Sequence, residues 1–286
     1  MEKKNNYFEL KKQVLKRFED AGIDEISDFD WICCEITGKK RSELGLIKEF
    51  SEKELDKIEK AVEKRLQHIP LGYIFGKTNF YGYDFIVSKD VLIPRLDTEI
   101  LVERVIEEIK SRKTKVSVLD VGTGSGAIAI TIAKETGAEV TAVDISEKAL
   151  EIAKQNAKIN NAKVSFLESD LFSGIQDLKV DFIVSNPPYI ESAEIDRLMP
   201  EVREFEPILA LDGGESGLDF YEKIVGEADK HLNPKGKLIF EIGYNQGESV
   251  SSLMKQKFKN VEVIKDYLGN DRVVIGEMYD WKIEKD

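Results

Sequence analysis

The chain has 286 residues, of which 42% are hydrophobic and 34% charged, as in an ordinary globular protein with one large core and a second, smaller one. No stretch approaches the roughly 20 apolar residues of a membrane span, and the polar N-terminus lacks the apolar run of a signal peptide, so we expect a cytoplasmic protein with no membrane partner. The net charge of −12 opposes binding along a phosphate backbone, and we expect no direct nucleic-acid binding.

The first part of the chain, residues 1–72, is predicted to be a small helical domain. Ser51 and Glu54 have the spacing of a capping box, in which each side chain accepts a hydrogen bond from the backbone of the other residue. Pro70 ends the helix that follows, because proline has no N–H for the helical ladder. The apolar residues at helical spacing are Phe8, Val14, Leu15, Phe18, Leu55, Ile58, Val62 and Leu66. We expect them to form the core of a helical bundle.

Residues 73–93 change to a β-type sequence, in which aromatic residues alternate with glycines. This pattern predicts a β-hairpin that links two domains. Beyond it, Asp97-Thr98 is expected to cap a helix that carries Ile100, Leu101, Val105, Ile106 and Ile109. Residues 94–286 then make up the second, larger domain.

Short apolar strands alternate with helical segments through this second domain. The predicted strands are residues 116–119, 140–143, 164–167, 182–184, 237–240, 261–264 and 273–275. Such alternation predicts an α/β fold with a parallel sheet covered on both faces, and ligands bind at the carboxyl ends of such strands.

A glycine-rich loop follows the first of these strands and opens a helix. Its residues are Gly122, Thr123, Gly124, Ser125 and Gly126. The glycine spacing differs from that of dinucleotide-binding folds, and no Lys-Ser or Lys-Thr pair follows as in a P-loop. Taken alone, the loop fits either a structural turn or a nucleotide site.

Acidic residues after the next two strands favour the nucleotide site. Asp144 ends the second strand, where its carboxylate can accept hydrogen bonds from both ribose hydroxyls. Asp170 follows the third strand and is placed to meet the edge of an adenine. Phe172 is placed either to pack on the adenine ring or to fill the core. Only two histidines and two adjacent cysteines occur, so no metal centre is expected.

The fourth strand runs directly into the tetrapeptide Asn186, Pro187, Pro188 and Tyr189. This tetrapeptide matches the motif of amino-group methyltransferases, and its position beside the glycine loop argues against a mere stiff turn. The side-chain carbonyl of Asn186 and the backbone carbonyl of Pro187 can each accept a hydrogen bond from a planar NH₂ group. These acceptors orient a poorly nucleophilic nitrogen and favour its positively charged transition state. The tetrapeptide therefore predicts methylation of an amide or aniline-like nitrogen, with Tyr189 packed on the planar group.

The strand ends resemble the seven-stranded, Rossmann-like fold of S-adenosylmethionine-dependent methyltransferases. Within that fold the chain closely resembles the HemK/PrmC family, which methylates the glutamine of the Gly-Gly-Gln motif in class-1 peptide release factors. The similar segments are residues 70–76, 80–82, 92–99, 120–129, 186–189, 206–207, 211–214, 241–246 and 266–272. One residue departs from the family pattern: Leu96 stands where a proline is usual.

The resemblance implies roles for individual residues. The cofactor S-adenosylmethionine would contact the glycine loop, Asp144, Asp170, Phe172 and Asn186, and the glutamine amide would lie against residues 186–189. Arg95 and Glu99 would either brace the active-site wall or form a plain surface ion pair. Residues 1–72 would bind the release factor, and we expect a monomer.

Two other functions are compatible with the sequence. A nucleic-acid methyltransferase would act on an exocyclic NH₂ of a base, but it usually needs a recognition domain, and the acidic charge opposes it. A non-catalytic binding module on a degenerate methyltransferase fold should have lost the glycines, Asp144 or Asn186, and none is lost.

Overall fold

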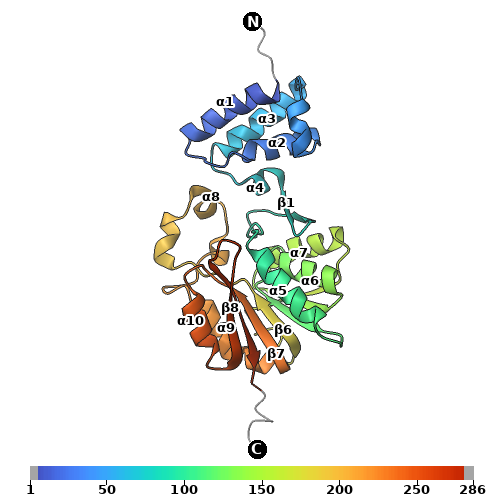
Figure 1. The fold of residues 1–286 in the computed structure, drawn as a ribbon, viewed down its shortest axis with the longest axis vertical. Helices are drawn as coiled ribbons and strands as arrows, with labels where there is room; N and C mark the ends of the chain where they lie inside the picture. The colour runs from blue at the N-terminus through green and yellow to red at the C-terminus, as the bar shows by residue number, and fades with distance from the viewer. Residues whose placement is uncertain (1–5, 280–286) are drawn as a thin grey trace, which may run out of the picture. The chain divides into compact units, whose positions relative to one another are not determined.

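The computed structural model describes residues 6–279, which divide into two compact units (Figure 1). The first unit comprises the chain up to Gly76 together with residues 199–205. It contains α1 (Tyr7–Asp20), α2 (Asp28–Thr37), the short 3-10 helix η1 (Arg41–Leu46), α3 (Glu52–Arg65), α4 (Leu71–Phe75) and α8 (Pro200–Arg203). The second unit comprises the rest of the chain, from Lys77 onward.

The first unit is helical, as predicted, around a core that includes Phe18, Phe29, Ile32, Leu44, Ile58 and Val62. The predicted capping box is confirmed at the start of α3. Ser51 accepts from the Glu54 backbone N–H, and the Glu54 carboxylate accepts from the Ser51 backbone N–H at 2.8 Å. Residues 199–205 join this unit through Arg65, whose guanidinium contacts Asp28 at 2.6 Å and Glu201 at 3.1 Å. A neighbour so distant in sequence was not foreseen from the helical pattern.

The second unit begins with a hairpin of β1 (Lys77–Phe80) and β2 (Tyr83–Ile86), which pair antiparallel. The hairpin is shorter than the predicted segment 73–93 at both ends, since α4 continues to Phe75 before it and β2 already ends at Ile86. The remaining strands form one sheet in the order β5-β4-β3-β6-β7-β9-β8. Their bounds are β3 (Ser117–Val121), β4 (Glu139–Asp144), β5 (Val164–Glu168), β6 (Val180–Ser185), β7 (Leu232–Glu241), β8 (Phe258–Lys265) and β9 (Asp271–Met278).

All seven predicted strands are present, but the sheet is not parallel throughout. Strands β3 to β7 pair in parallel, whereas β9 runs antiparallel to both β7 and β8. The reason is the connection: only residues 266–270 join β8 to β9, and a connection this short can join antiparallel strands only.

Helices cover both faces of the sheet, as the alternation predicted (Figure 1). The bounds are α5 (Thr98–Lys110), α6 (Ala127–Thr136), α7 (Glu147–Ile159), α9 (Asp219–His231) and α10 (Gly247–Met254). Successive strand residues point to opposite faces, so Val118 packs with α5 and α6, while Leu119 packs with α9 and α10. None of the helices between residues 6 and 279 has the length and apolar character needed to span a bilayer.

Candidate functional site

A cavity of about 430 Å³ opens at the carboxyl ends of the parallel strands. Its volume suits a small organic ligand. The loops after β3, β4, β5 and β6 all contribute to its wall. From the predicted site residues it takes Arg95, Gly122, Thr123, Gly124, Ser125, Asp144, Asp170, Asn186, Pro187 and Pro188. The structure therefore brings the glycine loop, two of the predicted acids and most of the tetrapeptide to one cavity.

The glycine loop presents bare backbone to this cavity. Gly122 and Gly124 have φ values of +75° and +54°, and a Cβ on either would meet no atom within 4 Å, which leaves room for a ligand against the backbone. Gly126 does not line the cavity. A Cβ there would lie 2.9 Å from Ile130 Cδ1 and 3.1 Å from Ala153 Cβ, so this glycine allows α6 to pack against α7.

Asp144 both lines the cavity and organises the loop. Its Oδ2 accepts from the Gly124 N–H at 2.8 Å and its Oδ1 accepts from the Ser146 N–H at 2.9 Å. Burial raises the pKa of the Asp144 carboxyl, while these backbone donors oppose the rise. Each oxygen keeps a lone pair for a further donor, as a pair of ribose hydroxyls would require.

The structure separates the other two residues predicted at the adenine. Asp170 is exposed and lines the cavity. Phe172 is only 2% exposed and stacks on His231 with ring centroids 4.6 Å apart, so it lies in the core and not on the cavity wall. Of the two roles open to Phe172 in the sequence, the geometry favours the core.

Two residues outside the motif, Gln246 and Gly213, hold the tetrapeptide in place. Gln246 donates from Nε2 to the carbonyls of Tyr189 and Gly217, each at 3.1 Å, and its Oε1 accepts from the Gly243 N–H. Gly213 lies so close that a Cβ would be 2.7 Å from Tyr189 Cα. Tyr189 itself does not line the cavity, and burial raises the pKa of its hydroxyl to about 12. Its position suggests that it anchors the loop.

Arg95 and Glu99 have different surroundings. Arg95 lines the cavity and forms an ion pair with Glu206, which is only 5% exposed. Glu99 lies outside the lining and accepts a hydrogen bond from the Tyr81 backbone N–H at 2.7 Å. The partner of Arg95 is therefore Glu206, and no ion pair between Arg95 and Glu99 forms.

A buried acid behind the loop was not predicted as part of the site. Asp120 is fully buried and accepts from the Thr123 hydroxyl at 2.6 Å. Burial and the nearby Asp144 charge together raise the pKa of Asp120 to about 7. Its position as the penultimate residue of a buried strand was a signal that could have revealed it, because a carboxyl there loses its water.

Asp120→Asn is expected to stabilise the protein at alkaline pH. A carboxyl whose pKa is raised on folding stabilises the fold below its unfolded pKa of about 4, and this contribution is lost as the pH rises towards 7. The amide cannot ionise, so the variant should unfold several °C above wild type at pH 8, at about 2–4 °C for each kcal/mol. The gap should narrow as the pH falls towards 4. Thermal unfolding across this range measures the difference in Tm, with Asp177→Asn, at an exposed aspartate, as the control. A difference in Tm that does not change with pH contradicts the prediction.

Two protein-family models match the chain. "Methyltransferase small domain" matches residues 95–202, and "PrmC N-terminal domain" matches residues 9–76. A methyltransferase from Pyrococcus furiosus, with 24% sequence identity, has a similar fold at a TM-score of 0.52, over 69% of this chain and 90% of that one. The family models, together with the similar fold, define the chain as a methyltransferase.

Curated relatives narrow the assignment. A release factor glutamine methyltransferase of Fusobacterium nucleatum is 38% identical, over 97% of this chain and 84% of that protein. Another from Bacillus cereus is 39% identical, over 95% of this chain and 99% of that protein. At this identity and coverage the chain belongs to the release factor glutamine methyltransferase family. Its cofactor is S-adenosylmethionine, and the non-catalytic alternative is thereby set aside.

Proposed function

We propose that this enzyme transfers the methyl group of S-adenosylmethionine to the side-chain amide nitrogen of the glutamine in the Gly-Gly-Gln motif of class-1 peptide release factors, and so modulates translation termination. The observation that carries this proposal is the place of the tetrapeptide. Asn186, Pro187 and Pro188 line the same cavity as the glycine loop and Asp144. The names of the curated relatives support the choice of a release factor glutamine over a nucleobase.

The cavity residues fit the cofactor. Gly122 and Gly124 leave their backbone open to its amino-acid part, and the Asp144 carboxylate would accept from its ribose hydroxyls. Asp170 would meet the adenine edge from the exposed rim of the cavity. This proposed binding surface is completed by Thr123, Ser125 and Asn186. Gly126 and Phe172 would support it indirectly, Gly126 by allowing α6 to pack against α7 and Phe172 by filling the core.

The reaction needs positioning more than acid–base chemistry. The bound cofactor supplies a methyl group on a sulfonium, which is a good leaving group. The Asn186 side-chain oxygen and the Pro187 carbonyl would hold the two hydrogens of the glutamine NH₂ and turn its lone pair towards that methyl group. Both acceptors interact more strongly as the nitrogen becomes positive, so they stabilise the transition state beyond the ground state.

Residues 1–72 are proposed to bind the release factor. A groove on α1 is lined by apolar and basic side chains, namely Phe8, Lys11, Lys12, Leu15, Lys16 and Glu19. The Phe8 side chain is 65% exposed beside Gly45, and Leu46 is 78% exposed. Exposed apolar groups next to lysines suit a protein surface of mixed apolar and acidic character.

The double variant Phe8→Ser/Leu46→Ser is expected to raise the KM for a release factor about tenfold, because buried aromatic and aliphatic anchors dominate interfaces. Its affinity for S-adenosylmethionine should not change. Steady-state kinetics with varied release factor, and calorimetry with the cofactor, measure the two effects. Ile26→Ser is the matched control, since Ile26 is equally exposed in the same unit but lies outside the groove. Equal KM values for the double variant and the control would remove the exposed apolar surface of Phe8 and Leu46 from the interface.

We further propose that the enzyme works as a monomer in the cytoplasm, where release factors act, and that it does not bind nucleic acid directly. The deciding experiment is mass spectrometry of a purified class-1 release factor after incubation with the enzyme and S-adenosylmethionine. One added methyl on the glutamine of Gly-Gly-Gln is the expected result. Transfer of labelled methyl to duplex DNA or ribosomal RNA, with none to the release factor, would replace the proposed acceptor with a nucleobase.

A further inference from the structure

Two polar side chains to which the sequence analysis gave no individual role, Thr98 and Glu241, lie beside Asn186, and Thr98 also lines the cavity. Asn186 Nδ2 donates to Thr98 Oγ1 at 3.3 Å. Glu241 is the last residue of β7, and hydrogen bonds from the Thr98 and Asn186 side chains lower the pKa of its carboxyl against the effect of burial. Thr98 and Glu241 are 5% and 2% exposed, and Glu241 Oε2 makes no hydrogen bond within residues 6–279. A buried carboxyl with spare acceptor capacity beside the proposed catalytic amide calls for an explanation.

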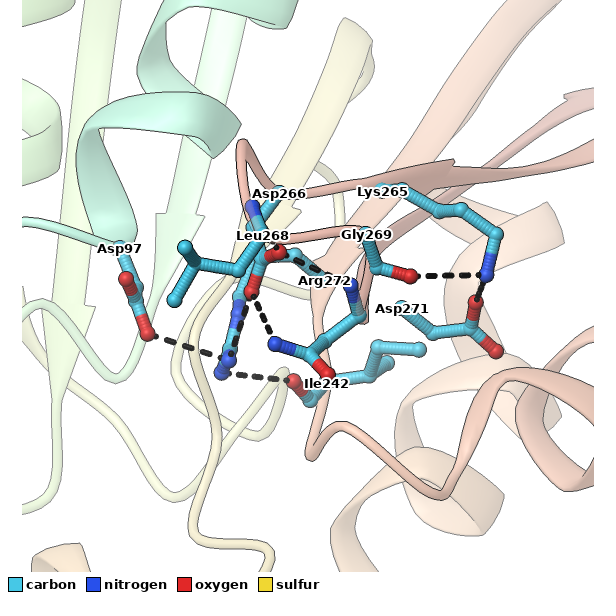
Figure 2. A network of polar contacts seen from close by, with 9 residues as sticks. Asp97, Ile242, Lys265, Asp266, Leu268, Gly269, Asp271 and Arg272 are labelled. Atoms are coloured by element: carbon cyan, nitrogen blue, oxygen red, sulfur yellow. Dashed lines mark hydrogen bonds and ion pairs between the residues drawn. The ribbon is translucent and has the colours of Figure 1, made fainter.

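Arg272, the second residue of β9, contacts the sequence neighbours of this pair, Asp97 and Ile242 (Figure 2). Its Nη2 lies 3.1 Å from Asp97 Oδ2 and 3.4 Å from Asp266 Oδ2, and its Nη1 donates to the Ile242 carbonyl at 3.4 Å. Asp97 immediately precedes Thr98, and Ile242 immediately follows Glu241. Arg272 thus links the side chain of the residue before Thr98 to the backbone carbonyl of the residue after Glu241, and its charge attracts the Glu241 carboxylate.

We infer that Thr98 and Glu241 form a relay that sets the orientation of the Asn186 amide, so that its oxygen and not its NH₂ faces the acceptor glutamine. This inference rests on the proposed function, in which Asn186 accepts a hydrogen bond from the substrate. Thr98 and Glu241 are positioning residues here, since neither is required to touch the reacting atoms.

The orientation follows from the donors and acceptors available. An ionised carboxylate can only accept hydrogen bonds, so the single Thr98 hydroxyl proton turns towards Glu241. Thr98 Oγ1 then has only lone pairs left for Asn186, and the Glu241 carboxylate, which also interacts with Asn186, can likewise only accept. Asn186 must therefore present its NH₂ to both. Because the amide oxygen lies on the opposite branch of the same planar group, it is directed away from Thr98 and into the cavity.

Protonation of Glu241 reverses this logic. The neutral carboxyl donates to Thr98, the Thr98 hydroxyl is then free to donate to Asn186, and the flipped amide turns its NH₂ towards the substrate NH₂. The titratable groups facing Glu241 are Arg272, Asp97, Tyr189 and Tyr221, on β9, before α5, after β6 and on α9. Burial raises the pKa of Glu241 to about 7 against the attraction of Arg272, so activity should fall as the pH drops through that value.

The hydroxyl is tested with full-length enzyme acting on purified release factor. Thr98→Val keeps the shape of the side chain and removes the hydroxyl that orients the Asn186 amide. It should lower kcat about tenfold or more, while calorimetry shows unchanged affinity for S-adenosylmethionine. Thr98→Ser restores the hydroxyl and should recover most of that loss. The matched control is Thr131→Val, since the Thr131 hydroxyl is fully buried but has no hydrogen-bond partner within residues 6–279.

The carboxylate is tested with Glu241→Gln, whose side chain cannot ionise. The acid limb of the wild-type kcat profile near pH 7 should disappear, leaving a low and pH-independent rate. In ¹⁵N spectra, the side-chain amide signals of Asn186, assigned by their loss in Asn186→Ala, should titrate in wild type and not in Glu241→Gln. These signals report the orientation of the amide without turnover.

The outcomes separate the relay from the proposed function. If wild-type enzyme leaves the release factor unmethylated, the proposed function fails first. If wild type methylates it but Thr98→Val matches Thr131→Val in kcat, or Glu241→Gln keeps the wild-type pH profile, the relay is wrong and the function stands. Loss of activity in Thr98→Val that Thr98→Ser does not recover would equally overturn it, because it would reflect packing and not the hydroxyl.

Discussion

Asn186→Ala is expected to lower kcat for release factor methylation by about 100- to 1,000-fold, the cost of removing one fixed group that stabilises developing charge. Its affinity for S-adenosylmethionine should stay close to wild type, because the glycine loop and Asp144 remain in place. Single-turnover kinetics with saturating cofactor measure the first quantity, and calorimetry the second.

Asp144→Ala is the informative counterpart to this variant. It removes both the proposed ribose acceptor and the hydrogen bonds that hold Gly124 and Ser146, so it should weaken cofactor binding by about 100-fold, or nearly 3 kcal/mol. Asn79→Ala, at an exposed residue of β1, is the control for loss of an asparagine side chain. If Asn186→Ala turns over at the wild-type rate, or loses cofactor affinity as Asp144→Ala does, then its assigned role is wrong.

Gly213→Ala is expected to lower kcat by about 100-fold, although Gly213 does not line the cavity. The added Cβ would lie 2.7 Å from Tyr189 Cα and 2.9 Å from the Pro188 carbonyl oxygen. Both are backbone atoms, so the tetrapeptide loop must shift to relieve the overlap. A shift of this loop moves the Asn186 and Pro187 carbonyls away from the substrate nitrogen. The free energy of unfolding should also fall, by about 1–3 kcal/mol, as for other overpacked sites.

Gly226→Ala is the control, and it should change the free energy of unfolding in the opposite direction. Gly226 lies within α9, and a Cβ there would meet no atom within 4 Å. The same substitution should therefore raise the free energy of unfolding by about 0.5–1 kcal/mol through the helix preference of alanine, and leave kcat unchanged. Denaturant unfolding and kcat measured on both variants make the comparison. Full activity in Gly213→Ala would show that the loop tolerates displacement and that its geometry is not critical.

The sequence predicted those features that depend on local patterns. The strand positions follow from short apolar runs, and the capping box at Ser51 follows from a spacing of three residues. The loop after β3 and the tetrapeptide after β6 reach the same cavity because carboxyl ends of parallel strands meet at one edge of the sheet. This much of the site is predictable, since the sheet topology converts strand ends that are far apart in sequence into neighbours.

Where a residue distant in sequence supplies the contact of a side chain, the sequence prediction was wrong or left open. The α5 helix does begin at Thr98, but the Asp97 side chain makes no capping hydrogen bond and instead contacts Arg272, 175 residues further along the chain. For Phe172 the sequence left two roles open, packing on the adenine or filling the core, and its ring packs on His231 in the core. In each case the side chain could satisfy more than one environment, and the sequence does not reveal which one the fold supplies.

By itself, the sequence determined the α/β class, the strand positions and the glycine loop, because each is encoded by neighbouring residues, and it predicted the chemistry of residues 186–189. Only the tertiary structure decided that β9 runs antiparallel, that Gln246 and Gly213 hold the tetrapeptide, and that Thr98, Glu241 and Arg272 gather behind Asn186. These contacts join segments of about 25 to 175 residues' separation, and such long-range contacts depend on how the strands and helices pack.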